Sequence, residues 1–331
     1  MSQAANHGVV RTRNIEICNR ERKRMNSIKH ILVVIHQFAE GPQPAVDKAA
    51  LLARCTGASV ELLVCKTHSG GGKSSTDVQD HEAPQADARL SDVLDGFASR
   101  ISAQGSKVSR RIVQGQSLHD SVLDYVRSSK ADIVIKDTRH HSLAKRTLLR
   151  NTDWYLARRC PVPVLLTKAK EWARLPIIMA ALGPKDASAS AVELDRQILN
   201  RAASLAGDLK GDLHVIHTFV PAALARTRSG GSDLAVDLEV EHAYERGQIE
   251  GSASAFGVTP GRLHIEMGTP ERCLPDSVTK YHADVVVIGA SLHGRWHRII
   301  VGSTAATVLE SLPCDLLIVT PPSVLRKAAA R

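Results

Sequence analysis

Residues 131–136 (ADIVIK) return 152 positions later as residues 283–288 (ADVVVI), and this repeat is the main evidence for the fold. Each copy is an Ala-Asp pair followed by β-branched and apolar residues, which is typical of a strand buried on both faces of a parallel sheet. Flanking segments repeat at offsets of 146 to 153: residues 31–35 with 177–181, 115–117 with 268–270, and 162–166 with 314–318. The sequence therefore predicts a duplicated unit about 150 residues long.

Strands and helices alternate within each copy, which predicts an α/β fold with right-handed crossovers. We expect two tandem doubly wound Rossmann-like domains, each with a five-stranded parallel sheet. The expected strands are 31–35, 60–64, 108–113, 131–136 and 162–167, then 177–182, 213–218, 262–267, 284–288 and 315–320. The expected helices are 44–56, 84–104, one carrying Leu118 to Val126, 151–160, 190–206, 233–255, one carrying Leu274 and Val278, and 303–312.

These elements divide the chain into five parts. We expect a basic leader at 1–27, a first domain at 28–168, a linker at 169–175, a second domain at 176–321 and a tail at 322–331.

Composition excludes several protein classes. The 331 residues are 43% hydrophobic and 23% charged, close to the average of soluble globular proteins. No apolar run is long enough for a membrane span, and no signal peptide is recognisable. The six cysteines include no CxxC pair, so we expect reduced thiols and a cytoplasmic protein. Aromatic residues are too few, at 4 Phe, 4 Tyr and 3 Trp, for an extended platform that stacks nucleic-acid bases.

The net charge of +9 is concentrated at the N-terminus. Residues 1–29 contain seven Lys or Arg and two Glu, so the remaining 302 residues carry only +4. Such an arm could bind nucleic acid or an anionic surface. We favour a solvated tail or a leader from an upstream start codon, because Met25 directly precedes the first strand, and we do not expect nucleic acid as a partner.

Ligands of open parallel sheets bind beyond the carboxyl ends of the strands, which directs attention to the segment after strand 284–288. There, Gly302 would let backbone N–H groups approach a phosphate, and Ser303 could cap the following helix. Arg295 and Arg298 could meet phosphate oxygens. An ordinary strand–loop–helix connection would show the same pattern, so these residues alone do not establish a site.

The duplicated unit, the turn at 268–271 (GTPE) and the run from 286–289 (VVIG) to 301–305 (VGSTA) resemble the universal stress protein family. The resemblance covers about residues 28–321. Segment 151–161 (NTDWYLARRCP) is similar to the first domain of the tandem, E-type subgroup. The resemblance implies an adenine nucleotide alpha hydrolase-like fold. It also implies that the last strands of the two copies pair within the chain as a pseudo-dimer, and two such chains could pair again.

Nucleotide-binding members of that family carry a G-x2-G-x9-G-[ST] loop around ATP phosphates and an Asp that ends the first strand. In the second copy the loop positions are Gly289, Leu292, Gly302 and Ser303, so the middle glycine is missing, although Gly294 follows two residues later. The Asp position is Leu182. The resemblance thus implies weak ATP or AMP binding in the second copy and leaves Mg²⁺ undecided. The implied contacts are Gly289, Leu292, Gly294, Arg295, Arg298, Gly302, Ser303 and Thr304.

The first copy has lost this pattern. Its loop positions are Asp137, His140, Arg150 and Asn151, and its strand-end residue is His36, so we expect no phosphate site there.

Other motifs have simpler explanations. Residues 70–74 (GGGKS) lack the first glycine and the following helix of a P-loop. His140 with His141, and His293 with His297, are interpreted as surface loop histidines rather than metal ligands, and we expect no metal.

We therefore expect a stress-response ligand sensor or binding scaffold that is not an enzyme and is at most a weak ATPase. One alternative is a relative that holds another hydrophobic or anionic ligand, or acts through protein contacts. An ATP-hydrolysing switch and a nucleic-acid binder are less favoured.

Overall fold

The structure is a computed structural model that describes residues 27–36, 43–67, 83–138, 153, 155–183, 189–222, 234–290 and 311–320. Its sheet contains ten strands in the order β3-β2-β1-β4-β5-β10-β9-β6-β7-β8. The first half supplies β1 (His30–Ile35), β2 (Ser59–Thr67), β3 (Val108–Gly115), β4 (Ile133–Asp137) and β5 (Val164–Thr167). The second supplies β6 (Ile177–Leu182), β7 (Asp212–Phe219), β8 (Leu263–Met267), β9 (Val285–Gly289) and β10 (Asp315–Val319).

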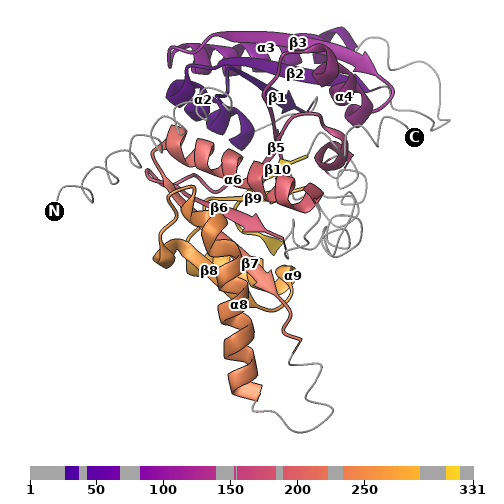
Figure 1. The fold of residues 1–331 in the computed structure, drawn as a ribbon. Helices are drawn as coiled ribbons and strands as arrows, with labels where there is room; N and C mark the ends of the chain where they lie inside the picture. The colour runs from indigo at the N-terminus through magenta and orange to yellow at the C-terminus, as the bar shows by residue number, and fades with distance from the viewer. Residues whose placement is uncertain are drawn as a thin grey trace.

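Each half is doubly wound, as predicted, and the two halves share one sheet (Figure 1). All strand pairs within a half are parallel. The last strands, β5 and β10, pair antiparallel with Leu317 opposite Leu165, so the two five-stranded sheets become continuous. This pairing covers an edge that each half would otherwise expose.

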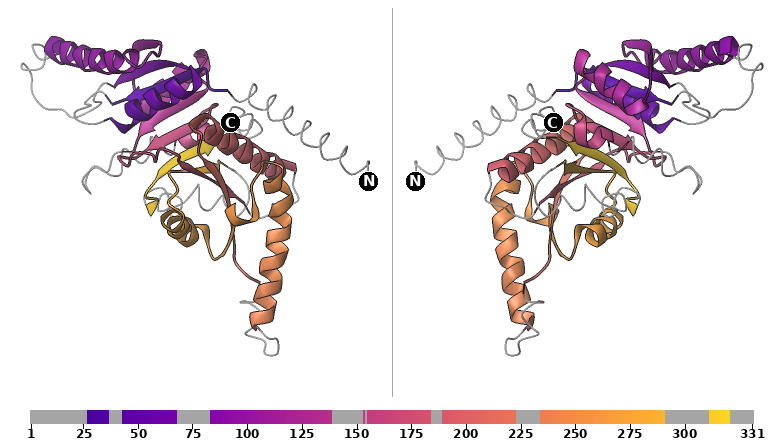
Figure 2. Two further views of the ribbon diagram at one scale, coloured as in Figure 1. Left: turned by 90° about the vertical axis from the view of Figure 1, so that its left-hand side faces the viewer. Right: turned by 90° about the vertical axis from the view of Figure 1, so that its right-hand side faces the viewer.

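Helices cover both faces of the sheet (Figure 2). The helices α2 (Pro44–Thr56), α3 (Ala83–Ser102), α6 (Ala189–Leu209) and α8 (Leu234–Ser254) pack on one face. The other face is covered by α4 (Leu118–Ser128) and α9 (Pro270–Lys280), together with residues 155–159. Because α2 also packs against α6, the core on the first face is continuous across the two halves. Among the described residues, no helix combines the length and hydropathy needed to cross a membrane.

Local sequence explains the bounds of α2. Pro44 occupies the first turn, where its missing N–H costs nothing. Val46, Ala49 and Leu52 are fully buried on one side. Gly57 ends the helix with φ 75°, a left-handed conformation that glycine adopts without strain, and its N–H donates to the carbonyl of Ala53.

The repeated Ala-Asp pair has a structural role in both halves. The Asp132 carboxylate accepts hydrogen bonds from the backbone N–H groups of Lys29 (2.8 Å) and His30 (2.9 Å), where β1 begins. The Asp284 carboxylate accepts the N–H of Ile177 at 3.0 Å, where β6 begins. The strongest repeat in the sequence therefore marks the residue that joins the fourth strand of each half to the start of its first strand.

The strand register corrects one detail of the predicted alignment. Val33 pairs with Ile135 in the first half, and Ala180 pairs with Val287 in the second. The first strands are therefore offset by 147 residues, not 146. Leu182 matches Ile35, and both are 1% exposed core residues. Gly183, not Leu182, is the counterpart of the strand-end residue His36.

A buried ion pair joins the halves at the β5–β10 junction. The Lys48 ammonium on α2 lies 2.6 Å from the carboxylate of Asp315, the first residue of β10, and the two side chains are 6% and 1% exposed. Asp315 also accepts hydrogen bonds from the N–H of Lys168 and the indole N–H of Trp172, both at 2.8 Å. Lys48 donates to the carbonyl of Lys168 at 2.7 Å. Lys48, residues 168–172 and Asp315, from three separate segments, thus provide one another's hydrogen-bond partners in the buried interior.

Candidate functional site

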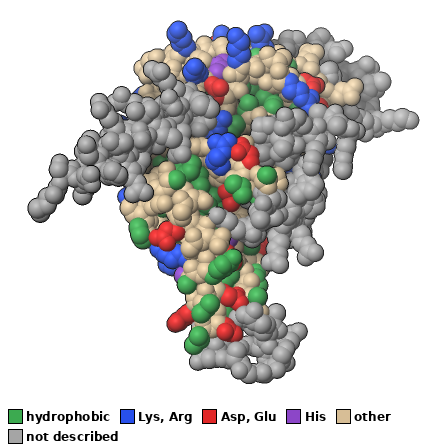
Figure 3. Space-filling model, viewed as in Figure 1, with side chains coloured by type: hydrophobic (Ala, Val, Ile, Leu, Met, Phe, Trp, Pro, Cys, Tyr) green, Lys and Arg blue, Asp and Glu red, His purple; other side chains and the backbone are tan. Residues whose placement is uncertain are grey.

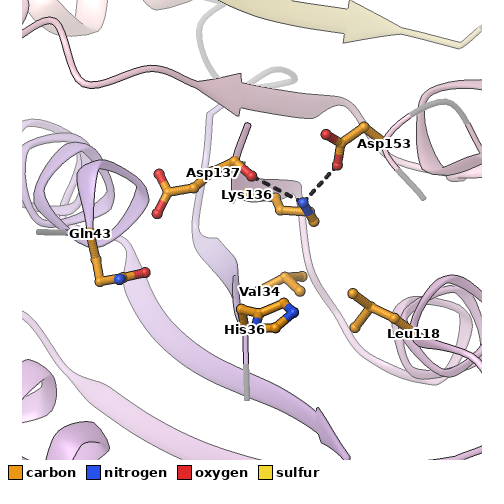
Figure 4. A pocket seen from close by; sticks show the side chains of 7 residues that line it. All are labelled: Val34, His36, Gln43, Leu118, Lys136, Asp137 and Asp153. Atoms are coloured by element: carbon orange, nitrogen blue, oxygen red, sulfur yellow. Dashed lines mark hydrogen bonds and ion pairs between the residues drawn. The ribbon is translucent and has the colours of Figure 1, made fainter. Parts of the chain in front are cut away.

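The carboxyl ends of β1 and β4 form a pocket in the first half. The chain winds in opposite directions from these neighbouring strands, which is where open α/β sheets bind ligands. The space at this pocket amounts to about 400 Å³, a figure that counts the open solvent at its mouth. It is lined by Val34, His36, Gln43, Leu118, Lys136, Asp137 and Asp153 (Figure 4).

Asp137 occupies the position of the first loop glycine and is already engaged within the protein. Its carboxylate accepts the backbone N–H of Ala45 at 2.7 Å, in the first turn of α2. It also accepts the hydroxyl hydrogen of the buried Thr167 at 2.7 Å. A carboxylate therefore occupies the helix N-terminus beside this pocket, where an anionic ligand would otherwise be favoured.

Lys136 and Asp153 form the second charged feature of the pocket. The Lys136 ammonium lies 2.7 Å from the Asp153 carboxylate, and the two side chains are 10% and 15% exposed. The same ammonium donates to the carbonyl of Asp137 at 3.0 Å. With two carboxylates and one ammonium, the lining is negative, so the described residues do not fit nucleotide phosphates.

The corresponding strand ends of the second half carry no charged side chain at β6 or β9. Gly289 ends β9 at the position of Asp137, and Gly183 follows β6. The Leu194 side chain of α6 packs against Gly289 so closely that an added Cβ would lie 2.6 Å from it. The Gly183 N–H donates to Asp195 at 3.4 Å. One carboxylate, that of Asp195, therefore lies beside this edge, although β6 and β9 themselves add no charge at their ends. Leu194 restricts the space for a ligand next to Gly289.

Of the sequence-predicted contacts, the structure describes only Gly289. The other predicted contacts, which are Leu292, Gly294, Arg295, Arg298, Gly302, Ser303 and Thr304, lie outside the described residues. So do residues 1–26, residues 70–74, the two histidine pairs at 140–141 and 293/297, most of the expected helix 303–312 and residues 321–331.

A buried histidine near the second strand-end edge was not predicted. His217 on β7 is 0% exposed and contacts the carbonyl of Leu182 at 3.4 Å and the carboxylate of Glu245 on α8 at 3.2 Å. Desolvation lowers the pKa of His217, and the Glu245 carboxylate opposes this shift. The only sequence signal was a histidine within an apolar strand; its counterpart in the first half is the buried Val64.

Three buried thiols are unreactive, and the described residues form no metal cluster. Burial raises the pKa of Cys65, Cys160 and Cys314 to about 12, so these thiols stay protonated at neutral pH. None of the five described cysteines forms a disulfide. Within the described ranges, no three His, Cys, Asp or Glu side chains come together as metal ligands.

Comparison with known proteins agrees with this architecture. A solved chain from Pseudomonas aeruginosa UCBPP-PA14, a putative universal stress protein by its description, is 27% identical with a TM-score of 0.69, covering 93% of this chain and 100% of that one. Universal stress protein E of Escherichia coli K12 is 23% identical, covering 66% of this chain and 69% of that protein. The Haemophilus influenzae homologue of that protein is 24% identical, covering 65% and 70%.

The sequence profile described as the universal stress protein family matches residues 27–168 and again residues 189–320. The two matches together span most of the chain; the first contains β1 to β5, and the second begins after β6 and contains β7 to β10. With its two copies joined through β5 and β10, the chain is a tandem member of the universal stress protein family, similar to the E-type proteins.

Proposed function

We propose that this protein is a cytoplasmic binding protein of the stress response, in which only the second half takes a ligand. One observation carries the proposal: equivalent strand ends have Asp137 in the first half and Gly289 in the second. The carboxylate occupies the helix N-terminus in the first half, whereas the glycine adds neither charge nor side chain. In this proposal the first domain, 28–168, contributes strand pairing and core burial to the two-domain sheet. The second domain, 176–321, holds the ligand.

The proposed ligand is an adenine nucleotide, ATP or AMP, bound weakly. Support comes from Gly289 at the strand end and from Gly302 and Ser303 in the sequence. Two features predict weak binding. Leu194 packs against Gly289, and Leu292 replaces the middle glycine of the loop.

The proposed activity is binding without robust turnover, at most a weak ATPase. Residues 289–302 contain no Asp or Glu that could hold Mg²⁺ beside Ser303. Universal stress proteins are in general not enzymes, which agrees with this proposal. The β5–β10 pairing supports a pseudo-dimer within one chain.

The test is calorimetric titration of the full chain with ATP, ADP and AMP. Gly289→Asp installs the first-half residue and should weaken binding by about tenfold or more, equivalent to about 1.4 kcal/mol. Gly289→Ala adds the Cβ that meets Leu194 without the charge, and its smaller effect measures the steric part. Gly302→Val should act in the same direction. The matched control is Gly261→Asp, which adds the same charge in open space just before β8 begins, at the opposite edge of the second half, and should leave binding unchanged. Thermal melting of each variant establishes that it is folded.

Nucleotide binding that is millimolar or weaker and unchanged by Gly289→Asp and Gly302→Val would contradict the proposal. Native mass spectrometry of protein purified from cells would then identify a carried hydrophobic or anionic ligand of another class.

A further inference from the structure

The amino-terminal part of α8 projects away from the body of the protein (Figures 1 and 2). The carboxyl-terminal part is anchored, because Ile249 and Ala253 are buried and Arg246 donates to the carbonyl of Pro260 at 3.1 Å. Nearer the start, His242 contacts the carbonyl of Ile265 at 3.1 Å. The opposite side of the helix faces solvent.

That exposed side carries an apolar stripe. Val236, Val240 and Tyr244 are 53%, 63% and 64% exposed, and their spacing of four residues places them on one side of the helix. Ala243 and Gly247, also exposed, lie beside them and would allow another chain to approach closely. Large apolar side chains gathered on one exposed face are typical of an interaction surface.

The charge on α8 restricts what can bind this stripe. The helix contains five carboxylates, on Asp237, Glu239, Glu241, Glu245 and Glu250, against the single Arg246. In Figure 3, hydrophobic and acidic side chains are intermixed along the projection. Like charge disfavours a second α8, nucleic-acid phosphates and anionic lipids. The favoured occupant is therefore a polypeptide that combines cationic and apolar side chains.

The chain itself contains such a segment. Residues 9–24 (VVRTRNIEICNRERKR) hold six Arg or Lys against two Glu, with two valines and two isoleucines among them. This segment lies outside the described residues. Its net charge of +4 equals in magnitude the net charge of −4 on α8. We propose that the exposed side of α8 is the docking surface for the cationic segment 9–24 of this chain.

The proposal is tested in the full chain by placing a photoreactive benzophenone amino acid at position 244, where it replaces a side chain of similar shape. Illumination followed by mass spectrometry should find cross-links into residues 9–24. The matched control places the same group at Val192, which is 56% exposed on α6. Position 192 should give no such cross-links.

Two further changes separate docking from chance contact. Glu239→Lys, combined with the reactive group at position 244, should lower the cross-link yield by about tenfold, because it replaces attraction by repulsion. Raising the salt concentration should lower the yield in the same direction. Absence of cross-links from position 244 into residues 9–24, or equal yields from positions 192 and 244, would overturn the proposal.

Discussion

Replacing Lys48 by methionine should destabilise the whole protein, because it removes one partner of the buried ion pair between the halves. The Asp315 carboxylate, 1% exposed, would keep only the N–H donors of Lys168 and Trp172. Removing one partner of a buried pair costs about 3–5 kcal/mol, since the other charge stays desolvated. We expect a loss of that size in the free energy of unfolding.

The assay is urea unfolding followed by circular dichroism and by tryptophan fluorescence, to which Trp172 beside the pair contributes. Arg100→Met is the matched control, because Arg100 pairs with Asp47 of α2, the helix that carries Lys48, and both of its paired side chains are about half exposed. Exposed pairs contribute about 0–1 kcal/mol. The double variant Lys48→Met/Asp315→Asn should cost less than the two single changes added together.

The pH dependence of the Lys48→Met penalty provides an internal check. Burial raises the pKa of Asp315, and the Lys48 ammonium opposes that shift. Without Lys48 the pKa of Asp315 rises further, so this carboxyl group takes up a proton more readily as the pH falls. The loss in free energy of unfolding caused by Lys48→Met should therefore become smaller at lower pH. A Lys48→Met variant within about 1 kcal/mol of the wild type at pH 7 would refute the role assigned to this pair.

Two other changes test the repeated aspartates and the histidines of the second half. Asp284→Ala should cost about 2–4 kcal/mol in urea unfolding, and more than Asp132→Ala, because Asp284 is 3% exposed and leaves backbone N–H groups without a buried acceptor. Burial lowers the pKa of His264 from 6.5 to about 4, so the unfolded chain binds the proton first as the pH falls. Stability should therefore decrease from about pH 6.5 towards pH 4, and a melting curve series should show a flatter dependence for His264→Phe; an equally steep dependence would contradict this assignment.

The fold was predictable because its signals are local. Apolar runs identify the strands, and Pro44 and Gly57 mark the ends of α2. The repeat then identified equivalent strands across the two halves. The one-residue difference between the 146 and 147 offsets arose because Ile31 and Ile177 both begin an apolar run and were aligned with each other. Only the pairing of these strands with the fourth strands shows that Leu182 matches Ile35.

The polar contacts were not predictable, because their partners are distant in the chain. Lys48 lies 267 residues from Asp315, and on α2 it resembles any solvated helix lysine. Asp137 was recognised as a lost glycine, yet nothing in the sequence indicated its contact with Ala45, 92 residues away. His217 shows the same limit, since its contacts come from two other elements, β6 and α8.

The two halves differ at the ends of their fourth strands, while the contact of the repeated Ala-Asp pair is shared. Asp132 and Asp284 make equivalent bonds, whereas Asp137 is replaced by Gly289. Because β5 and β10 pair and the core is continuous, a half that binds no ligand still contributes burial to the other. Such a half can carry a carboxylate at its own strand end, as at Asp137, while its last strand still pairs with the other half. The duplicated sheet therefore permits one strand end to carry a carboxylate that is hydrogen-bonded within the protein, while the equivalent strand end carries a glycine.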